Sequence, residues 1–204
     1  MIELDSSALI GKGLHRECFV HPLDPGLCIK IVVAGSINEN HREASYYRHL
    51  AKRDISWEML TRFHGLVDTN LGEGAVFDLV RDYDRQVSAT LACYLVSTTP
   101  DASVAAALAD ALARLKAYLL ENRVITMTLK PKNILFRLDG PDSGTLVIVD
   151  NIGNSDFVPL ADYSAALARR KIRRKWRRFE ASLLSQYPGN KILPRLVGNA
   201  QATR

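Results

Sequence analysis

Hydrophobic and polar positions repeat with a strand period in the first part of the chain and a helix period in the second. Residues 8–33 hold two apolar runs around a glycine-containing turn, followed by the nearly continuous apolar run GLCIKIVV. Short apolar runs rich in β-branched residues and bounded by turn formers are typical of strands. Residues 62–67 and 74–81 have the same character, so we expect them to join the same sheet.

Three segments have helical spacing. The first covers residues 40–53, the second residues 102–122, and the third runs from about residue 160 to residue 187. The second is the strongest, because it is rich in alanine and has an apolar stripe made of Leu108, Leu112, Leu115, Tyr118 and Leu119. Before the third helix, residues 134–140 and 145–151 read as a hairpin around a turn that contains Gly and Pro.

This order of elements predicts an α+β fold. A chain of 204 residues can bury one good core, or can form a small lobe and a larger one. We expect a first lobe over residues 1–82, with an antiparallel sheet and one helix, and a mainly helical second lobe over residues 83–204.

Positive charge is concentrated in one segment. The chain has 27 basic and 22 acidic residues, a net charge of +5, but eight of the basic residues fall within residues 169–178. The other residues therefore carry a net charge of about −3. The basic residues of this segment are Arg169, Arg170, Lys171, Arg173, Arg174, Lys175, Arg177 and Arg178.

The basic segment also has an apolar face, formed at helical spacing by Ile172, Trp176, Phe179 and Leu183. Two interpretations stay open. The segment is either a docking helix whose apolar face covers the core, or a surface for an anionic partner: a membrane, a nucleic acid or an acidic protein. The narrow apolar face argues against membrane insertion, and no helix-turn-helix or zinc pattern indicates specific DNA recognition.

Several classes of protein are excluded. No run approaches the roughly 18 apolar residues of a membrane-spanning helix, and the N-terminus lacks the basic start and apolar stretch of a secretory signal. The three cysteines form no CxxC pattern, which argues against a disulfide framework or a zinc site. We therefore expect a cytoplasmic protein.

The most informative segment is VITMTLKPKNILF, which resembles the catalytic loop of protein kinases. In that loop, H-R-D-L-x-x-x-N, the Asp accepts the proton of the acceptor hydroxyl and the Asn holds a metal ion. Asn133 falls at the Asn position, but Thr128 stands at the position of the catalytic Asp. Lys130 matches the residue that steadies the transferring phosphate in many kinases, and Asp150, in VDNIG, matches the metal-binding Asp of D-F-G. Asn133 and Asp150 bracket the predicted hairpin and would suit Mg²⁺, which prefers oxygen ligands.

The first lobe supplies counterparts of the residues that bind ATP in kinases. Gly11 and Gly13 lie between two predicted strands, as the first two glycines of a Gly-rich loop would, but Arg16 occupies the third glycine position. Lys30 lies within the apolar strand, where a kinase lysine contacts phosphates and pairs with an acid on the next helix, here Glu43.

The adenine-binding hinge falls around residues 79–82 in the same comparison. A kinase hinge uses backbone groups, so the identity of the side chains carries no information there. We assign purine contacts to Leu79 and Val80.

With these residues in view, the chain resembles the YrbL family of bacterial PhoP regulatory network proteins. The matching stretches are GKGLHRECFVHP, CIKIV, REASYYRHL, ENRVITMTLKPKNIL and VDNIG, together with the basic, Trp-containing tail. The resemblance implies a single domain over residues 1–204 with a protein-kinase-like two-lobed fold. Because few residues follow Gly153, the helical C-lobe would be truncated. It also implies a cytosolic protein linked to a two-component regulon that answers magnesium limitation.

Three functions follow from these observations. The first is a pseudokinase-like regulatory protein that binds ATP and Mg²⁺ between two lobes, because Thr128 cannot act as a base near neutral pH. The second is an active but atypical phosphotransferase, either a kinase or a nucleotidyl transferase. The third is a module without a nucleotide that binds anionic surfaces through residues 169–178.

Overall fold

The computed structural model describes residues 1–35, 38–96, 102–153, 164–191, 193–194 and 197. Its helices and strands give a mixed α+β fold. The chain divides into two compact units, which we call unit 1 and unit 2 and describe separately. Unit 1 consists of Met1–Trp57 and Thr61–Val80, and unit 2 of Glu58–Leu60 and the chain from Arg81 onward.

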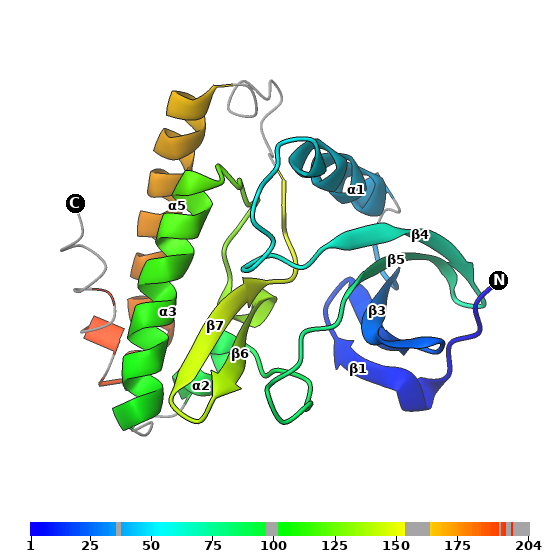
Figure 1. The fold of residues 1–204 in the computed structure, drawn as a ribbon, viewed down its shortest axis with the longest axis horizontal. Helices are drawn as coiled ribbons and strands as arrows, with labels where there is room; N and C mark the ends of the chain where they lie inside the picture. The colour runs from blue at the N-terminus through cyan, green and yellow to red at the C-terminus, as the bar shows by residue number, and fades with distance from the viewer. Residues whose placement is uncertain (36–37, 97–101, 154–163, 192, 195–196, 198–204) are drawn as a thin grey trace. The chain divides into compact units, whose positions relative to one another are not determined.

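Unit 1 contains a five-stranded antiparallel sheet in the order β1-β2-β3-β5-β4 and one described α-helix (Figure 1). A short 3-10 helix, η1 (Ser6–Ala8), precedes the sheet. The other elements are β1 (Leu9–Lys12), β2 (Arg16–His21), β3 (Asp24–Val32), α1 (Asn38–Ala51), β4 (Phe63–Thr69) and β5 (Gly72–Asp78).

Strand β3 is the middle strand of this sheet, and its continuous apolar run explains why. A strand that is covered on both faces has no polar side to alternate with. Ile29 and Ile31 are 0% and 2% exposed and belong to a hydrophobic cluster with Leu4, Phe19 and Val76. Since successive side chains point to opposite faces, Lys30 lies on the other face of the sheet.

Helix α1 packs its aromatic residues against the sheet. The ring of Tyr47 meets the ring of Phe77 edge-on, with centroids 5.4 Å apart, and lies 5.9 Å from the ring of Phe63. Leu50, one turn further along the helix, is fully buried. Aromatic pairs in this geometry add stabilisation beyond the area that they bury.

Unit 2 combines a two-stranded hairpin with helices. Within it, α3 packs against both β7 and α5 (Figure 1). Its elements are α2 (Leu91–Val96), α3 (Ala102–Glu121), η2 (Pro131–Asn133), β6 (Ile134–Gly140), β7 (Ser143–Ile148) and α5 (Ala165–Gln186).

The apolar stripes predicted for the two long helices of unit 2 are both buried. In α3, the side chains of the stripe are between 0% and 6% exposed. In α5, all four residues of the predicted apolar face are between 1% and 3% exposed. The indole Nε1 of Trp176 donates a hydrogen bond of 2.6 Å to Glu180, which satisfies both groups inside the core.

The basic segment of α5 divides into an outer and an inner part. Its six arginines are exposed, whereas Lys171 is only 6% exposed and Lys175 is half-buried. Including Lys171 in a partner-binding surface was therefore wrong, because helical rotation turns this residue toward the interior. Among the described residues, no helix is both long and apolar enough to cross a membrane.

The sequence located most elements, with shifts at their ends. Strand β5 ends at Asp78 and not at residue 81, and α1 begins two residues before the expected start. Helix α2 was not predicted, because six residues are too few to establish a periodicity. The tight packing at Gly74 was not predicted either. Two core residues leave no room for a side chain at this position.

Replacing Gly74 with alanine tests the packing of the sheet. The added Cβ would lie 2.5 Å from Cγ2 of Ile29 and 2.9 Å from Cδ1 of Ile31. Because overpacked cores typically lose about 1–3 kcal/mol, we expect the midpoint of urea unfolding to fall. Gly11→Ala is the control in the same sheet, since its Cβ would meet Cys18 at an ordinary 3.7 Å. Equal midpoints for the two variants would contradict this account.

Candidate functional site

Lys30 is a nearly buried cation in the middle of the unit 1 sheet. It pairs in register with Cys18 of β2 and Ala75 of β5, and it is 8% exposed. Its Nζ lies 4.3 Å from the centroid of the Phe77 ring, a distance at which a cation is attracted to an aromatic face. The lysine predicted to contact phosphates is therefore held in a low-dielectric setting, where its charge acts strongly.

Glu43 of α1 makes an ion pair that the sequence did not suggest. Its Oε2 lies 2.5 Å from Nη1 of Arg16, the residue at the third glycine position. The two side chains are 2% and 13% exposed, so this pair connects β2 to α1 almost out of contact with water. The pairing of Glu43 with Lys30 stays a prediction. Alternation along β2 and β3, which places Arg16 and Lys30 on one face, is the signal that could have indicated the cluster.

The two glycines lie where they were expected, next to and within the turn between β1 and β2. The amide of Gly13 donates to the carbonyl of Arg16 at 2.8 Å, which closes the turn. Gly11 lies in β1 opposite Cys18. Between them, Lys12 forms a salt bridge of 2.8 Å with Glu17, and this hydrogen bond raises the pKa of Lys12.

Leu79 and Val80, assigned to the hinge, follow β5. The amide of Leu79 donates to the carbonyl of Gly26 at 2.7 Å, which ties the segment to the start of β3. Val80 is 8% exposed. The Leu79 amide, one of the backbone donors of the expected hinge, therefore already makes a hydrogen bond within unit 1.

The cysteines of this unit are free thiols, as expected. A hydrogen bond with Cys18, and then burial, raise the pKa of Cys28 well above its ordinary value. A thiol in this state stays protonated and is a poor nucleophile, so Cys28 is a packing residue.

In unit 2, the hairpin brings Asn133 and Asp150 to the same open end, as its sequence predicted. Ile134 and Ile148 are the last paired residues before that end, and the amide of Val149 donates to the carbonyl of Asn133 at 3.0 Å. Asn133 is 8% exposed and Asp150 is half-buried. The two candidate metal ligands therefore come from adjacent backbone positions at the end of one hairpin.

The loop that carries Thr128 and Lys130 is held beside Asp150 by backbone pairing. The amide of Met127 donates to the carbonyl of Asn151 at 2.7 Å, and a second bond of 3.0 Å runs from Gly153 to Ile125. Both Thr128 and Lys130 are exposed. Unit 2 thus gathers all four of its predicted site residues into one loop cluster.

Lys175 is a positioning residue that the sequence analysis placed on the outer surface instead. Its Nζ donates a hydrogen bond to the carbonyl of Met127, so α5 is attached directly to the loop that holds Thr128. A basic run gives no signal for such a contact, because every lysine in it looks solvated.

The donor set at the hairpin end fits magnesium. Asn133 and Asp150 would supply one amide and one carboxylate oxygen, and Mg²⁺ takes few protein ligands when phosphate oxygens and waters complete its shell. Oδ1 of Asp150 also accepts a hydrogen bond from Asn151 at 2.8 Å, which orients the carboxylate. Within the part of the chain that the structure describes, no three His, Cys, Asp or Glu side chains form a metal-binding group of their own.

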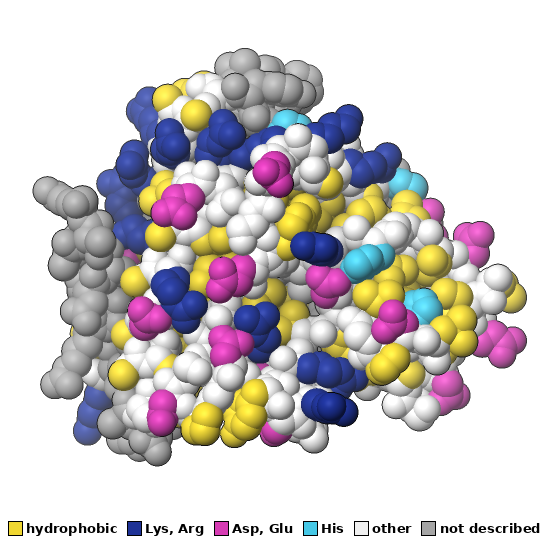
Figure 2. Space-filling view, viewed as in Figure 1, with side chains coloured by type: hydrophobic (Ala, Val, Ile, Leu, Met, Phe, Trp, Pro, Cys, Tyr) yellow, Lys and Arg dark blue, Asp and Glu magenta, His cyan; other side chains and the backbone are white. Residues whose placement is uncertain are grey.

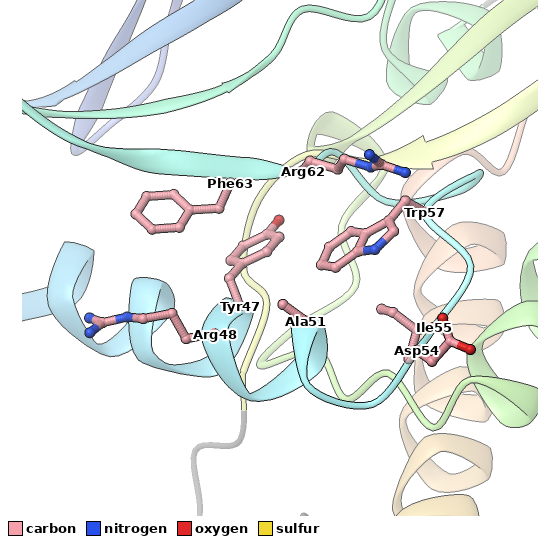
Figure 3. Close-up of a pocket in the computed structure, with 8 residues that line it drawn as sticks. All are labelled: Tyr47, Arg48, Ala51, Asp54, Ile55, Trp57, Arg62 and Phe63. Atoms are coloured by element: carbon pink, nitrogen blue, oxygen red, sulfur yellow. The ribbon is translucent and has the colours of Figure 1, made fainter.

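Unit 1 also has a pocket of about 420 Å³ that is separate from the predicted site residues (Figure 3). The ring of Tyr47 lies between those of Phe63 and Trp57, and the guanidinium of Arg62 lies 6.0 Å from the centroid of the Trp57 ring. The lining residues are Tyr47, Arg48, Ala51, Asp54, Ile55, Trp57, Arg62 and Phe63. None of the predicted site residues lines this pocket, and its aromatic residues are the only sequence signal for it.

Comparison with known proteins assigns the chain to a family. The family model described as "PhoP regulatory network protein YrbL" matches residues 2–184, a range that includes every predicted site residue. Two relatives named "Uncharacterized protein YrbL", from Escherichia coli (strain K12) and Shigella flexneri, are each 40% identical over 184 residues. The matches cover 89% of this chain and 87% of each relative. The chain therefore belongs to the YrbL family of PhoP regulatory network proteins.

Proposed function

We propose that this protein binds ATP with magnesium and acts as a pseudokinase-like regulator in the PhoP network. The observation that carries the proposal is Lys30, which is 8% exposed in the middle strand of the sheet. Together with Arg16 on the same sheet face, Lys30 concentrates positive charge at one place, and cations placed in this way form charge-assisted hydrogen bonds with phosphate. Phosphate binding by a lysine at this place in a sheet is the arrangement found in protein kinases.

The surroundings of Lys30 support a role with phosphates. Arg16 and Glu43 form their ion pair from the same sheet face and the helix that covers it. A fixed carboxylate beside cations orients them and strengthens charge-assisted hydrogen bonds. We assign the phosphates to Lys30, the orienting role to Glu43, and the turn that approaches the phosphates to Gly11 and Gly13.

We assign the contact with the purine of ATP to the segment after β5. The Leu79 amide already donates to Gly26, so we assign the purine contact to the backbone of Val80 and the role of holding that segment to Leu79. Side chains do not decide this contact, and a variant of Val80 that keeps its size should bind equally well.

Asn133 and Asp150 of unit 2 would hold the magnesium ion. When bound, the ion would neutralise charge on the phosphates of ATP. The chain's own contribution is the hairpin end that holds both ligands, together with the orienting hydrogen bond from Asn151 to Asp150.

Thr128 is the reason why we propose a regulator and not an active kinase. A hydroxyl does not accept a proton near neutral pH, and loss of a positioned base typically costs about 10²–10⁴-fold in rate. The proposal includes a protein-kinase-like two-lobed fold with a truncated helical C-lobe, and a cytoplasmic location, where ATP is abundant. Nucleotide occupancy would then change what the protein binds and would not drive a reaction.

A second candidate function is an active atypical phosphotransferase. Lys130 favours it, because this lysine is exposed and lies in the loop that is paired with the Asp150 segment. Positioning and electrostatic stabilisation can supply much of a phosphoryl-transfer rate without a base. Nucleotidyl transfer belongs to the same class, with the α-phosphate as the group transferred.

Nucleotide binding is tested by thermal unfolding with and without ATP and Mg²⁺. A ligand at 100 times its Kd stabilises the folded state by about 2.7 kcal/mol, so the wild type should melt at a higher temperature. Lys30→Met keeps the bulk of the side chain and should lose most of this shift. Its own melting temperature without ATP should fall, because removing one charge from a buried cluster leaves the remaining charges less well compensated.

The matched control is Lys52→Met, which removes an exposed lysine of the same unit and should keep the full shift. A wild type that ATP does not stabilise would contradict the proposal. A full shift in Lys30→Met would show that Lys30 does not bind the nucleotide.

Asp150→Asn tests the metal ligand. In the wild type, ATP with Mg²⁺ should raise the melting temperature more than ATP with EDTA does. The variant keeps the shape of the side chain but loses the carboxylate charge that Mg²⁺ prefers, so the difference between the two conditions should vanish. If the difference survives unchanged, Asp150 does not hold the ion.

Catalysis is tested with ATP labelled on the γ- or the α-phosphate, incubated with the protein and a cell lysate. We expect no transfer from either position, because Thr128 supplies no base. Transfer of the γ-label that Asp150→Asn abolishes would establish the kinase instead, and transfer of the α-label would establish a nucleotidyl transferase.

A further inference from the structure

Helix α5 presents a surface made entirely of arginine, which we call the arginine face. Figure 2 shows Lys and Arg side chains gathered along the edge where α5 lies in Figure 1. All six residues are exposed: Arg169, Arg170, Arg173, Arg174, Arg177 and Arg178. Both lysines of the segment turn inward, so every exposed cation between Arg169 and Arg178 can make the two parallel hydrogen bonds that phosphate accepts.

The arginines cover half of the helix circumference. At about 100° per residue, Arg169 and Arg178 point in directions about 180° apart, and the other four lie between them. The face is about 14 Å long at 1.5 Å per residue. It is therefore the surface of a half-cylinder with positive charge on its top and on both sides.

Nothing on the described part of α5 neutralises this charge. Glu180 is the acidic residue of the helix, and it is 6% exposed and accepts the hydrogen bond from Trp176. The rest of the chain has a net charge of about −3, so a polyanion would be directed to α5 and away from other surfaces.

We propose that the arginine face binds double-stranded DNA in its major groove, chiefly through the phosphates. A helix with its side chains is about 10–12 Å wide, and the major groove of DNA is about 12 Å wide with phosphates along both walls. A half-cylinder with cations on both sides matches such a groove. No Asn or Gln precedes Gln186 in α5, so the face has no side chain of the kind that reads adenine, and the arginines on its two sides would meet the phosphates of the two groove walls.

A bilayer matches this face less well. A flat surface meets only the outermost arginines and leaves those on the two sides in water. Peripheral membrane helices also insert apolar residues. The four residues of the apolar face of α5 are at most 3% exposed, and its two exposed leucines, Leu167 and Leu184, stand near opposite ends of the helix and form no continuous apolar surface.

Fluorescence anisotropy with two short DNA duplexes of unrelated sequence tests the proposal. Both, matched in G·C content, should bind with similar affinity. Because each phosphate contact contributes about −0.9 to the slope of log K against log salt, six contacts predict a slope of about −5. Replacing Arg173, Arg174 and Arg177 with glutamine should weaken binding about tenfold or more and make the slope shallower by about 3.

Two controls separate the arginine face from charge in general. Glutamine at Lys52, Arg85 and Lys191, which are exposed cations outside the face, should leave both affinity and slope nearly unchanged. Lysine at the three arginine positions should restore most of the affinity, and circular dichroism should show that each variant remains folded.

Three results would overturn the proposal. One is a wild-type slope shallower than about −1, which means at most one phosphate contact. Another is single-stranded DNA bound as tightly as duplex DNA, which would show that binding does not require the major groove. The last is tighter binding to vesicles of anionic phospholipid than to DNA, which assigns the face to a membrane.

Discussion

An ammonium group in the middle of a hydrophobic sheet is the constraint on which the rest of this account depends. Lys30 lies between Ile29 and Ile31 in the middle strand, and it is 8% exposed. The face that it occupies also holds the Arg16–Glu43 ion pair and the Phe77 ring. Charge is therefore concentrated at one place in an otherwise apolar layer. This feature is typical of a binding site for a highly charged ligand and not of a surface that only packs against its neighbours.

Unit 2 reaches its arrangement by backbone pairing. The hairpin fixes Asn133 beside Val149, and antiparallel bonds fix the 125–127 segment beside residues 151–153. Such bonds do not depend on side chains, so the shape of the loop does not depend on which residue stands at position 128. Lys175 of α5 then attaches the helix to this loop through Met127, so the arginine face and the candidate site share one element.

Periodicity predicted those parts of the fold that one local pattern determines. The stripes of α3 and α5, the apolar strand β3 and the hairpin all follow from the spacing of apolar residues, and all were found. Contacts between segments far apart in sequence were missed. Arg16 and Glu43 are 27 residues apart, and the inward turn of Lys171 depends on where α5 packs. The pocket around Trp57 arises from a loop for which no periodicity exists.

Hydrogen–deuterium exchange of the whole chain, with and without ATP and Mg²⁺, tests the central claim most directly. Amides that a ligand covers or rigidifies exchange more slowly. We predict slower exchange on adding ATP and Mg²⁺ in β1–β2, around Lys30, and in the segments 126–133 and 149–153. Exchange that is unchanged in all of these segments, or slowed only in α5, would contradict nucleotide binding by the residues assigned here.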